Sequence, residues 1–190
     1  MGDNCLHLVS PMPPSVNHYL GRRGFIKNGK AMSSSYKKKD AVSYQEGFKE
    51  YVREQVKLQG WKTDPDYSGH FYVDAVFYMN RRRRDANNMW KCMLDAITDT
   101  KLVWKDDSIV CERNNGILYD TDNPRVELTI RNVDYVGIFD NQKQLNEFEK
   151  NCSRCKRYKR NCSLLQRAKV GYIQPEIDNK ICKKYEEIKG

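Results

Sequence analysis

The sequence predicts an α+β fold: one domain with a mixed β-sheet and two main helices, followed by a small cysteine-rich tail. Apolar residues alternate at strand spacing in some segments and recur at helical spacing in others. The chain has 190 residues, which suits one domain with an appendage rather than two full domains. We therefore expect a main domain over 1–135, a linker helix over 136–150, and a basic tail over 151–190 that four cysteines hold around a metal.

The first half of the main domain is expected to contain a strand and a helix. A short strand over 4–10 is closed by a proline-rich segment. Residues 19–36, rich in Gly, Ser, Lys and Arg, are expected to form a loop or a loose, mobile hairpin. Over 41–58 apolar residues recur at helical spacing and the opposite face is charged, which predicts an amphipathic helix. Its apolar face carries Tyr44, Phe48, Tyr51, Val52 and Val56.

The second half is expected to run strand, helix, strand, strand, which gives an α/β-type layered domain. Residues 71–78 alternate, with Phe71 and Phe77 on one face, and this pattern predicts a strand. Helical spacing returns over 87–98. Two further strands are expected over 108–119 and 125–132, on either side of a turn rich in Asp, Asn and Pro.

The charge of the chain indicates a phosphate-binding partner. The net charge is +9, and the tail over 151–190 holds 11 basic and 4 acidic residues, so the main domain is nearly balanced. Within the main domain, basic residues gather at 37–39 and at 81–84. Such clusters favour binding to nucleic acid, because neutralising phosphates releases counterions. No apolar run approaches the ~20 residues of a membrane span and no signal-peptide pattern is present, so we expect a cytoplasmic protein without a membrane partner.

Acidic residues fall at two places where sheet elements are expected to end. Asp85 follows the arginine run at the junction of a strand and a helix, and Asp107 precedes a later strand. If the fold brings them together, their carboxylates suit a hard cation such as Mg²⁺, which supports phosphodiester hydrolysis. Lys91, on the polar face of the helix, is placed to stabilise the charged transition state. A purely structural explanation stays open: an aspartate before a helix is often an N-cap, and Asp95 with Lys91 can form a surface ion pair.

Three segments, in order, resemble the RusA family of Holliday-junction resolvases. They are PPSVNHY from Pro13, RRRRDANNMWKCMLDAI from Arg81, and VWKDDSIV from Val103. The similarity covers about residues 5–132. It implies a homodimeric, Mg²⁺-dependent endonuclease of bacterial or phage origin that binds four-way DNA junctions and cuts two strands symmetrically in recombination and repair. Mn²⁺ is a possible substitute for Mg²⁺.

Carried over by position, the resemblance implies a catalytic set of Asp85, Lys91 and Asp107. It implies that Asp85, Asn87 and Asp107 bind the metal, although the family usually has aspartate where Asn87 stands. Asparagine offers a neutral carbonyl oxygen, so metal affinity should fall. Asp95 or Asp106 is a possible source of a replacement oxygen. The resemblance also places Asn17 near DNA, and the arginine run is expected to hold flanking phosphates through Arg81, Arg82, Arg83 and Arg84.

The tail carries Cys152, Cys155, Cys162 and Cys182. In a cytoplasmic chain this spacing favours a zinc site, and four thiolates also suit an iron–sulfur cluster. Free cysteines in a flexible basic tail are the alternative. Basic residues around the first pair are expected to contact DNA, and they are Lys156, Arg157, Lys159 and Arg160.

Three functions therefore stay open. The first is a junction-cleaving nuclease. The second is a non-catalytic junction-binding protein, which Asn87 suggests. The third is a metal-stapled adaptor whose tail binds a protein partner.

Overall fold

The computed structural model describes residues 4–62, 64, 69–133, 135–158 and 160–188. The chain forms two compact units, Met1–Val133 and Asp134–Gly190. The first unit is a mixed α+β domain, as the sequence predicts. No helix in the described part of the chain has both the length and the apolar character needed to cross a membrane.

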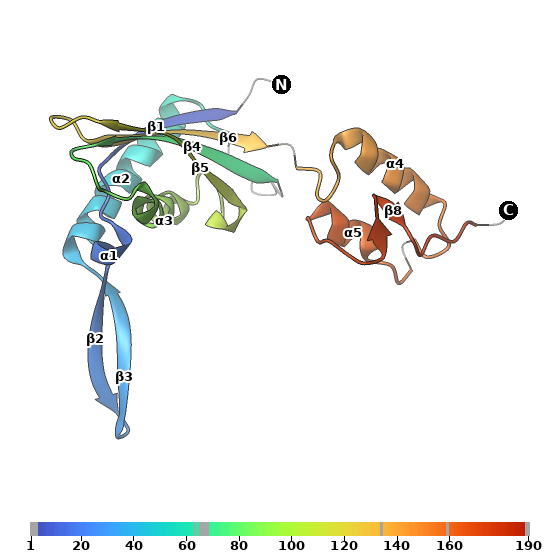
Figure 1. Cartoon of the computed structure of the whole chain (residues 1–190), viewed down its shortest axis with the longest axis horizontal. Coiled ribbons are helices and arrows are strands. Elements are labelled where there is room, and N and C mark those ends of the chain that lie inside the picture. Colours follow the sequence, from blue (N-terminus) through green and yellow to red (C-terminus); the bar gives the residue numbers. More distant parts are fainter. Residues whose placement is uncertain (1–3, 63, 65–68, 134, 159, 189–190) are drawn as a thin grey trace. The chain divides into compact units, whose positions relative to one another are not determined.

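A four-stranded sheet forms the centre of the first unit, in the order β1-β6-β4-β5 (Figure 1). The strands are β1 (Cys5–Pro11), β4 (His70–Met79), β5 (Val110–Tyr119) and β6 (Arg125–Val133). Strand β6 pairs antiparallel with both β1 and β4, whereas β5 lies parallel to β4. The mixed sheet is therefore confirmed, and β5 is an edge strand.

Two helices complete the core of this unit. They are α2 (Lys39–Leu58) and α3 (Trp90–Thr100), and they contact each other. The predicted alternation in β4 is confirmed, because Phe71, Val73 and Phe77 are buried in the same cluster as the apolar residues of both helices. Phe77 meets Trp90 edge to face, with ring centroids 5.7 Å apart. This packing fixes the start of α3 beneath the end of β4.

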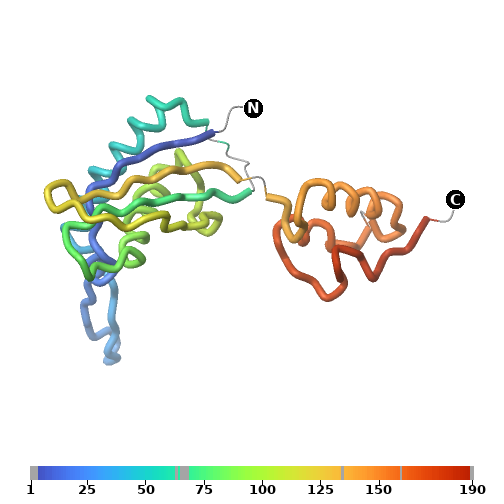
Figure 2. The backbone as a smooth tube through the Cα atoms, turned by 45° about the horizontal axis from the view of Figure 1, so that its top comes forward, coloured from blue at the N-terminus to red at the C-terminus, as the bar shows by residue number. Residues whose placement is uncertain are grey.

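Of the two alternatives expected over 19–36, a loop or a loose hairpin, the structure shows a hairpin, and it is regular. Strands β2 (Leu20–Lys27) and β3 (Lys30–Lys37) pair in continuous antiparallel register. Asn28 and Gly29 both have positive φ, at 52° and 72°, which suits the two-residue turn of a tight hairpin. The hairpin extends away from the central sheet in both views (Figures 1 and 2). It follows a short helix that the sequence did not predict, α1 (Val16–Tyr19).

The second unit has a small core of its own. It contains α4 (Gln142–Ser153), α5 (Leu164–Lys169) and the two-residue strands β7 (Ile177–Asp178) and β8 (Ile181–Cys182). Its apolar core cluster consists of the buried residues Phe139, Leu145, Phe148, Leu165 and Ala168. The helix expected near the end of the linker is present as α4, but it packs inside this unit and carries Cys152, so it is part of the cysteine-rich fold.

Candidate active site

The turn between β4 and α3 presents Asp85. Its side chain caps a short 3₁₀ helix, η1 (Ala86–Met89): Oδ1 accepts from the Asn87 backbone N–H at 3.0 Å, and Oδ2 accepts from Asn88 Nδ2 at 3.0 Å. The capping role considered from the sequence is therefore present. A carboxylate accepts about four hydrogen bonds or ligands in total, so both oxygens retain acceptor capacity. Capping and cation binding are compatible at this residue.

Asn87 is held by a side chain from the edge strand. Its Oδ1 accepts from Asn114 Nδ2 at 2.9 Å, and Asn114 Oδ1 in turn accepts from Trp90 Nε1 at 3.0 Å. Trp90 is buried in the core and begins α3. This chain of hydrogen bonds fixes the turn that bears Asp85 against strand β5.

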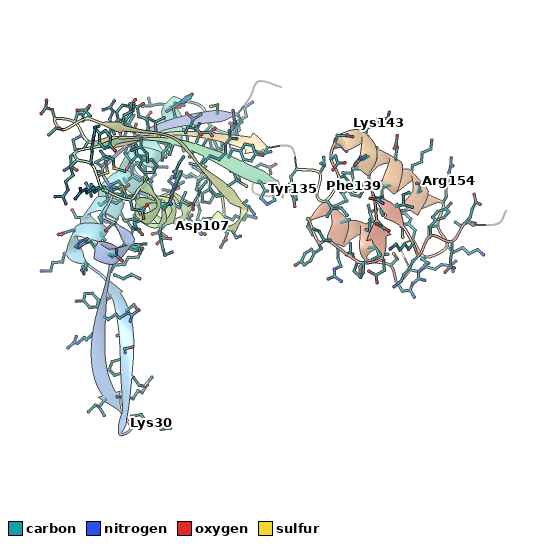
Figure 3. The ribbon with its side chains drawn as sticks, in the orientation of Figure 1. Lys30, Asp107, Tyr135, Phe139, Lys143 and Arg154 are labelled. Atoms are coloured by element: carbon teal, nitrogen blue, oxygen red, sulfur yellow. The ribbon has the colours of Figure 1, made fainter. Side chains whose placement is uncertain are left out.

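The second acidic segment contacts the same helix. Asp107 begins another short 3₁₀ helix, η2 (Asp107–Ile109), which lies against α3. Its neighbour Asp106 is exposed and caps η2: its Oδ1 accepts from the Ser108 backbone N–H at 2.9 Å, and hydrogen bonds from Ser108 lower the pKa of Asp106. Asp107 is half-buried, and Figure 3 labels it below the sheet. Asp106 caps η2 as Asp85 caps η1, and Asp107 is the candidate catalytic residue of the pair because its charge acts on Lys91.

Lys91 lies on α3, and its side chain is close enough to Asp107 in η2 to feel the charge of that carboxylate. Lys91 Nζ forms an ion pair with Asp95 Oδ1 at 3.2 Å, one helical turn away. Asp95 Oδ2 also accepts from the Tyr19 hydroxyl at 2.5 Å. The hydrogen bond to Asp95 raises the pKa of Lys91 most, and the negative charge of Asp107 raises it further. The ion pair between Lys91 and Asp95 that the sequence suggested is present, and both carboxylate oxygens of Asp95 accept hydrogen bonds, one from Lys91 and one from Tyr19.

Glu112 adds a carboxylate that the sequence analysis did not select. On β5 it is two residues from Asn114, and both pair with β4 residues of the helix-covered face, Val73 and Ala75. Partial burial raises the pKa of Glu112, and the charge of Asp107 raises it further. The register of the parallel pair places Glu112 opposite Val73 and Asn114 opposite Ala75, and local sequence pattern carries no signal for such a pairing.

The structure therefore brings the predicted residues Asp85, Asn87, Lys91 and Asp107 to elements that all contact or belong to α3. With Glu112, the set offers carboxylate and amide oxygens, which are the donors that Mg²⁺ prefers. The residues thus fit a hard cation by their chemistry. Among the described residues no three His, Cys, Asp or Glu side chains form a ready-made metal cluster.

The arginine run forms the surface strip next to Asp85. Arg81, Arg82 and Arg83 are exposed, and Arg84 donates to Asn80 Oδ1 at 3.1 Å. Arg83 has a φ of 65°, which is unusual for a residue other than glycine and marks a sharp change in chain direction. Asn17 is exposed on α1, and α1 contacts both η1 and α3. The two predicted DNA-contacting segments therefore both adjoin the acidic site.

The β2–β3 hairpin is a second basic surface that the sequence analysis missed. From Leu20 to Lys37 it carries five basic residues and no acidic residue. Its residues are exposed except Gly21, and Lys30 is labelled at its tip (Figure 3). Phe25, Ile26 and Met32 are exposed large apolar residues on the same ribbon. An Asn-Gly pair flanked by Lys27 and Lys30 was the signal that sequence reasoning did not use.

The cysteines of the second unit also come together. Cys152, Cys155, Cys162 and Cys182 line one cavity of about 380 Å³. Burial raises the pKa of Cys152 to about 11, with further contributions from the other three thiols. Of the tail residues expected to contact DNA, Lys156 and Arg160 are exposed, and Arg157 is paired with Glu186 at 3.5 Å. Lys159 lies outside the described residues.

Comparison with known proteins identifies the first unit. The family model described as Endodeoxyribonuclease RusA matches residues 11–131. This range runs from the end of β1 into β6 and contains Asn17, the hairpin, Asp85, Lys91, Asp107 and Glu112. No curated protein matches the chain. The match stops before the cysteine-rich unit begins.

Proposed function

Because the chain belongs to the RusA family of endodeoxyribonucleases, we propose that it is a Mg²⁺-dependent nuclease that binds four-way DNA junctions and cuts them symmetrically. The family match covers nearly all of the first unit. One observation carries the proposal: Asp85 caps η1, Asp107 begins η2, and both short helices contact α3, the helix that bears Lys91. The elements that bear two acidic residues distant in sequence thus both adjoin the helix that bears Lys91.

Each residue of the site has a distinct task in this proposal. A divalent cation, when bound, lowers the pKa of a coordinated water and neutralises phosphate charge. Asp85 and Asp107 hold the cation and are themselves held by the turns that they begin. Lys91 stabilises negative charge on the phosphate, and its raised pKa keeps it charged at neutral pH. Asp95 and Tyr19 orient Lys91 through the hydrogen bonds that they form.

Glu112 compensates for the charge that Asn87 lacks. Asp95 is ion-paired with Lys91, and Asp106 is exposed and caps η2, whereas the charge of Asp107 acts on both Lys91 and Glu112. Glu112 is close enough to Asp107 for the charge of Asp107 to raise its pKa. It lies on β5 two residues before Asn114, which donates a hydrogen bond to Asn87. We therefore assign the negative charge of the site to Asp85, Asp107 and Glu112, with Asn87 contributing a carbonyl oxygen.

Two basic surfaces bind the DNA. The arginine run contacts phosphates next to the cleaved bond, and the β2–β3 hairpin contacts an arm of the junction. A two-stranded ribbon fits the major groove of a duplex, and its cationic side chains neutralise phosphates. These contacts recognise the phosphate backbone and the shape of the DNA. We therefore expect selectivity for the branched structure more than for base sequence.

The cutting unit is a homodimer. A four-way junction has twofold symmetry, and a dimer with C₂ symmetry presents two identical sites to two equivalent phosphates. One bound junction then receives two nicks. Light scattering of the purified protein, alone and with a junction, measures this stoichiometry directly.

The second candidate is a junction-binding protein without turnover. Asn87 favours it, since one negative charge is missing from the motif. The two functions differ in one assay: the purified protein is incubated with a synthetic four-way junction or a linear duplex of the same length, with and without Mg²⁺. The nuclease gives paired nicks in the junction only with the metal. The binding protein shifts the junction in a gel and leaves both DNAs intact.

A further inference from the structure

The four cysteines of the second unit come from three separate places in its chain. Cys152 lies in α4 and Cys155 follows in the next turn, Cys162 precedes α5, and Cys182 lies in β8. All four nonetheless line one cavity of about 380 Å³, together with Phe148, Leu165 and Tyr185. All four are free thiols. Random placement of cysteines in a surface tail does not explain this convergence.

The backbone around the cysteines is arranged to donate to sulfur. The Glu186 N–H donates to Cys155 Sγ at 3.5 Å, and the Lys184 backbone hydrogen-bonds to Cys182. The loop between Cys152 and Cys155 is a tight turn, with the Cys155 N–H donating to the Cys152 carbonyl at 2.9 Å. Backbone N–H donors of this kind are the partners that orient sulfur ligands around a metal.

We infer that the second unit binds one Zn²⁺ through Cys152, Cys155, Cys162 and Cys182. The chain has three histidines, and all lie before residue 71, so the donor set is four thiolates. Structural zinc takes four such ligands in a tetrahedron with Zn–S distances of about 2.3 Å. The sulfurs line the cavity without forming a metal cluster among the described residues, so binding draws them inward.

The lysines near the cavity and the small apolar core of the second unit both support a zinc site. Zn²⁺ with four thiolates carries a net charge of −2, and the cavity wall includes Lys180 and Lys184. Among the described residues of the unit, the apolar core cluster contains five buried hydrophobic residues. Domains of fewer than about 70 residues with so little core usually need a metal or disulfides to stay folded. The metal therefore serves as a structural staple for this unit.

Elemental analysis of the full-length, untagged protein tests the inference. We expect one zinc per chain and no iron. Cys155→Ser and Cys182→Ser should each lose the zinc, whereas Cys5→Ser and Cys111→Ser, in the first unit, should retain it. Metal-free wild-type protein, iron with acid-labile sulfide in place of zinc, or zinc retained in both tail variants would overturn the assignment.

Thiol alkylation of the wild-type chain tests the same site without any substitution in the second unit. Mass spectrometry should find the four tail cysteines protected from alkylation until a chelator removes the metal. Cys5 and Cys111 should react to the same extent with and without chelator. Equal reactivity of the tail cysteines before and after chelation would contradict the site. Neither measurement involves DNA, so its outcome is independent of the nuclease proposal.

Discussion

Asn114 on the edge strand donates from Nδ2 to Oδ1 of Asn87 at 2.9 Å, and its own Oδ1 accepts from the buried indole of Trp90. This pair of hydrogen bonds joins β5 to the turn that carries Asp85. It connects the stability of the core with the position of the candidate catalytic residues, and the first prediction follows from it.

Replacing Asn114 with alanine should impair cleavage more than binding. The substitution leaves the Trp90 N–H without its acceptor, which costs about 1–3 kcal/mol of unfolding free energy. It also releases the turn that bears Asp85, so we expect roughly tenfold slower cleavage, since positioning errors are costly in catalysis. Thermal unfolding and junction cleavage measure the two effects. Asn115→Ala is the neighbouring control, and equal loss of cleavage in both variants would contradict the prediction.

Replacing Asn87 with aspartate should lower the Mg²⁺ concentration needed for cleavage. The new carboxylate adds a negative charge and keeps an oxygen that Asn114 can donate to. A titration of junction cleavage against Mg²⁺ shows the shift. An unchanged Mg²⁺ requirement would mean that the amide at this position does not limit metal affinity.

Replacing Glu112 with glutamine should have the opposite effect on metal dependence, raising the Mg²⁺ requirement. The same change should stabilise the metal-free protein at neutral pH. Because the pKa of Glu112 is raised, the folded protein binds this proton more tightly than the unfolded chain, and ionisation costs stability. The cost grows as pH rises from the ordinary pKa through the raised one. Melting temperatures should therefore differ at pH 7 and coincide below about pH 4, and the reverse pattern would refute this role.

Neutralising the tip of the hairpin should weaken binding in a salt-dependent way. The double variant Lys27→Gln/Lys30→Gln removes two cations, so the slope of log affinity against log salt should fall by up to about 2. The control Lys57→Gln/Lys62→Gln removes the same charge at and beyond the far end of α2. Fluorescence anisotropy with a labelled junction measures both. Equal effects of the two variants would show that net charge, rather than the hairpin, governs binding.

Regular periodicity made the central fold predictable. Strand β4 and helices α2 and α3 bury the residues whose spacing predicted them. Three elements escaped prediction because their signals are short: α1 and α5 have four and six residues, and the hairpin is specified mainly by the turn at Asn28 and Gly29. Local composition left a loop and a loose hairpin open there, and the two-residue turn produces a regular ribbon.

The site was predictable only where a motif carried it. Asp85, Lys91 and Asp107 were selected through the resemblance of their segments to the RusA family, and their roles stay a prediction. Glu112 and Asn114 did not, because the parallel register of β5 against β4 brings them to the site and no local pattern encodes that pairing.

The most direct test compares Asp107→Asn with Asp106→Asn in a four-way junction cleavage assay with Mg²⁺. The two variants remove the same charge from adjacent residues, but only Asp107 is assigned to the metal. We expect Asp107→Asn to bind the junction and leave it uncut, and Asp106→Asn to produce paired nicks. Cleavage by Asp107→Asn at the wild-type rate, or binding without cleavage by the wild-type protein in both Mg²⁺ and Mn²⁺, would contradict the account.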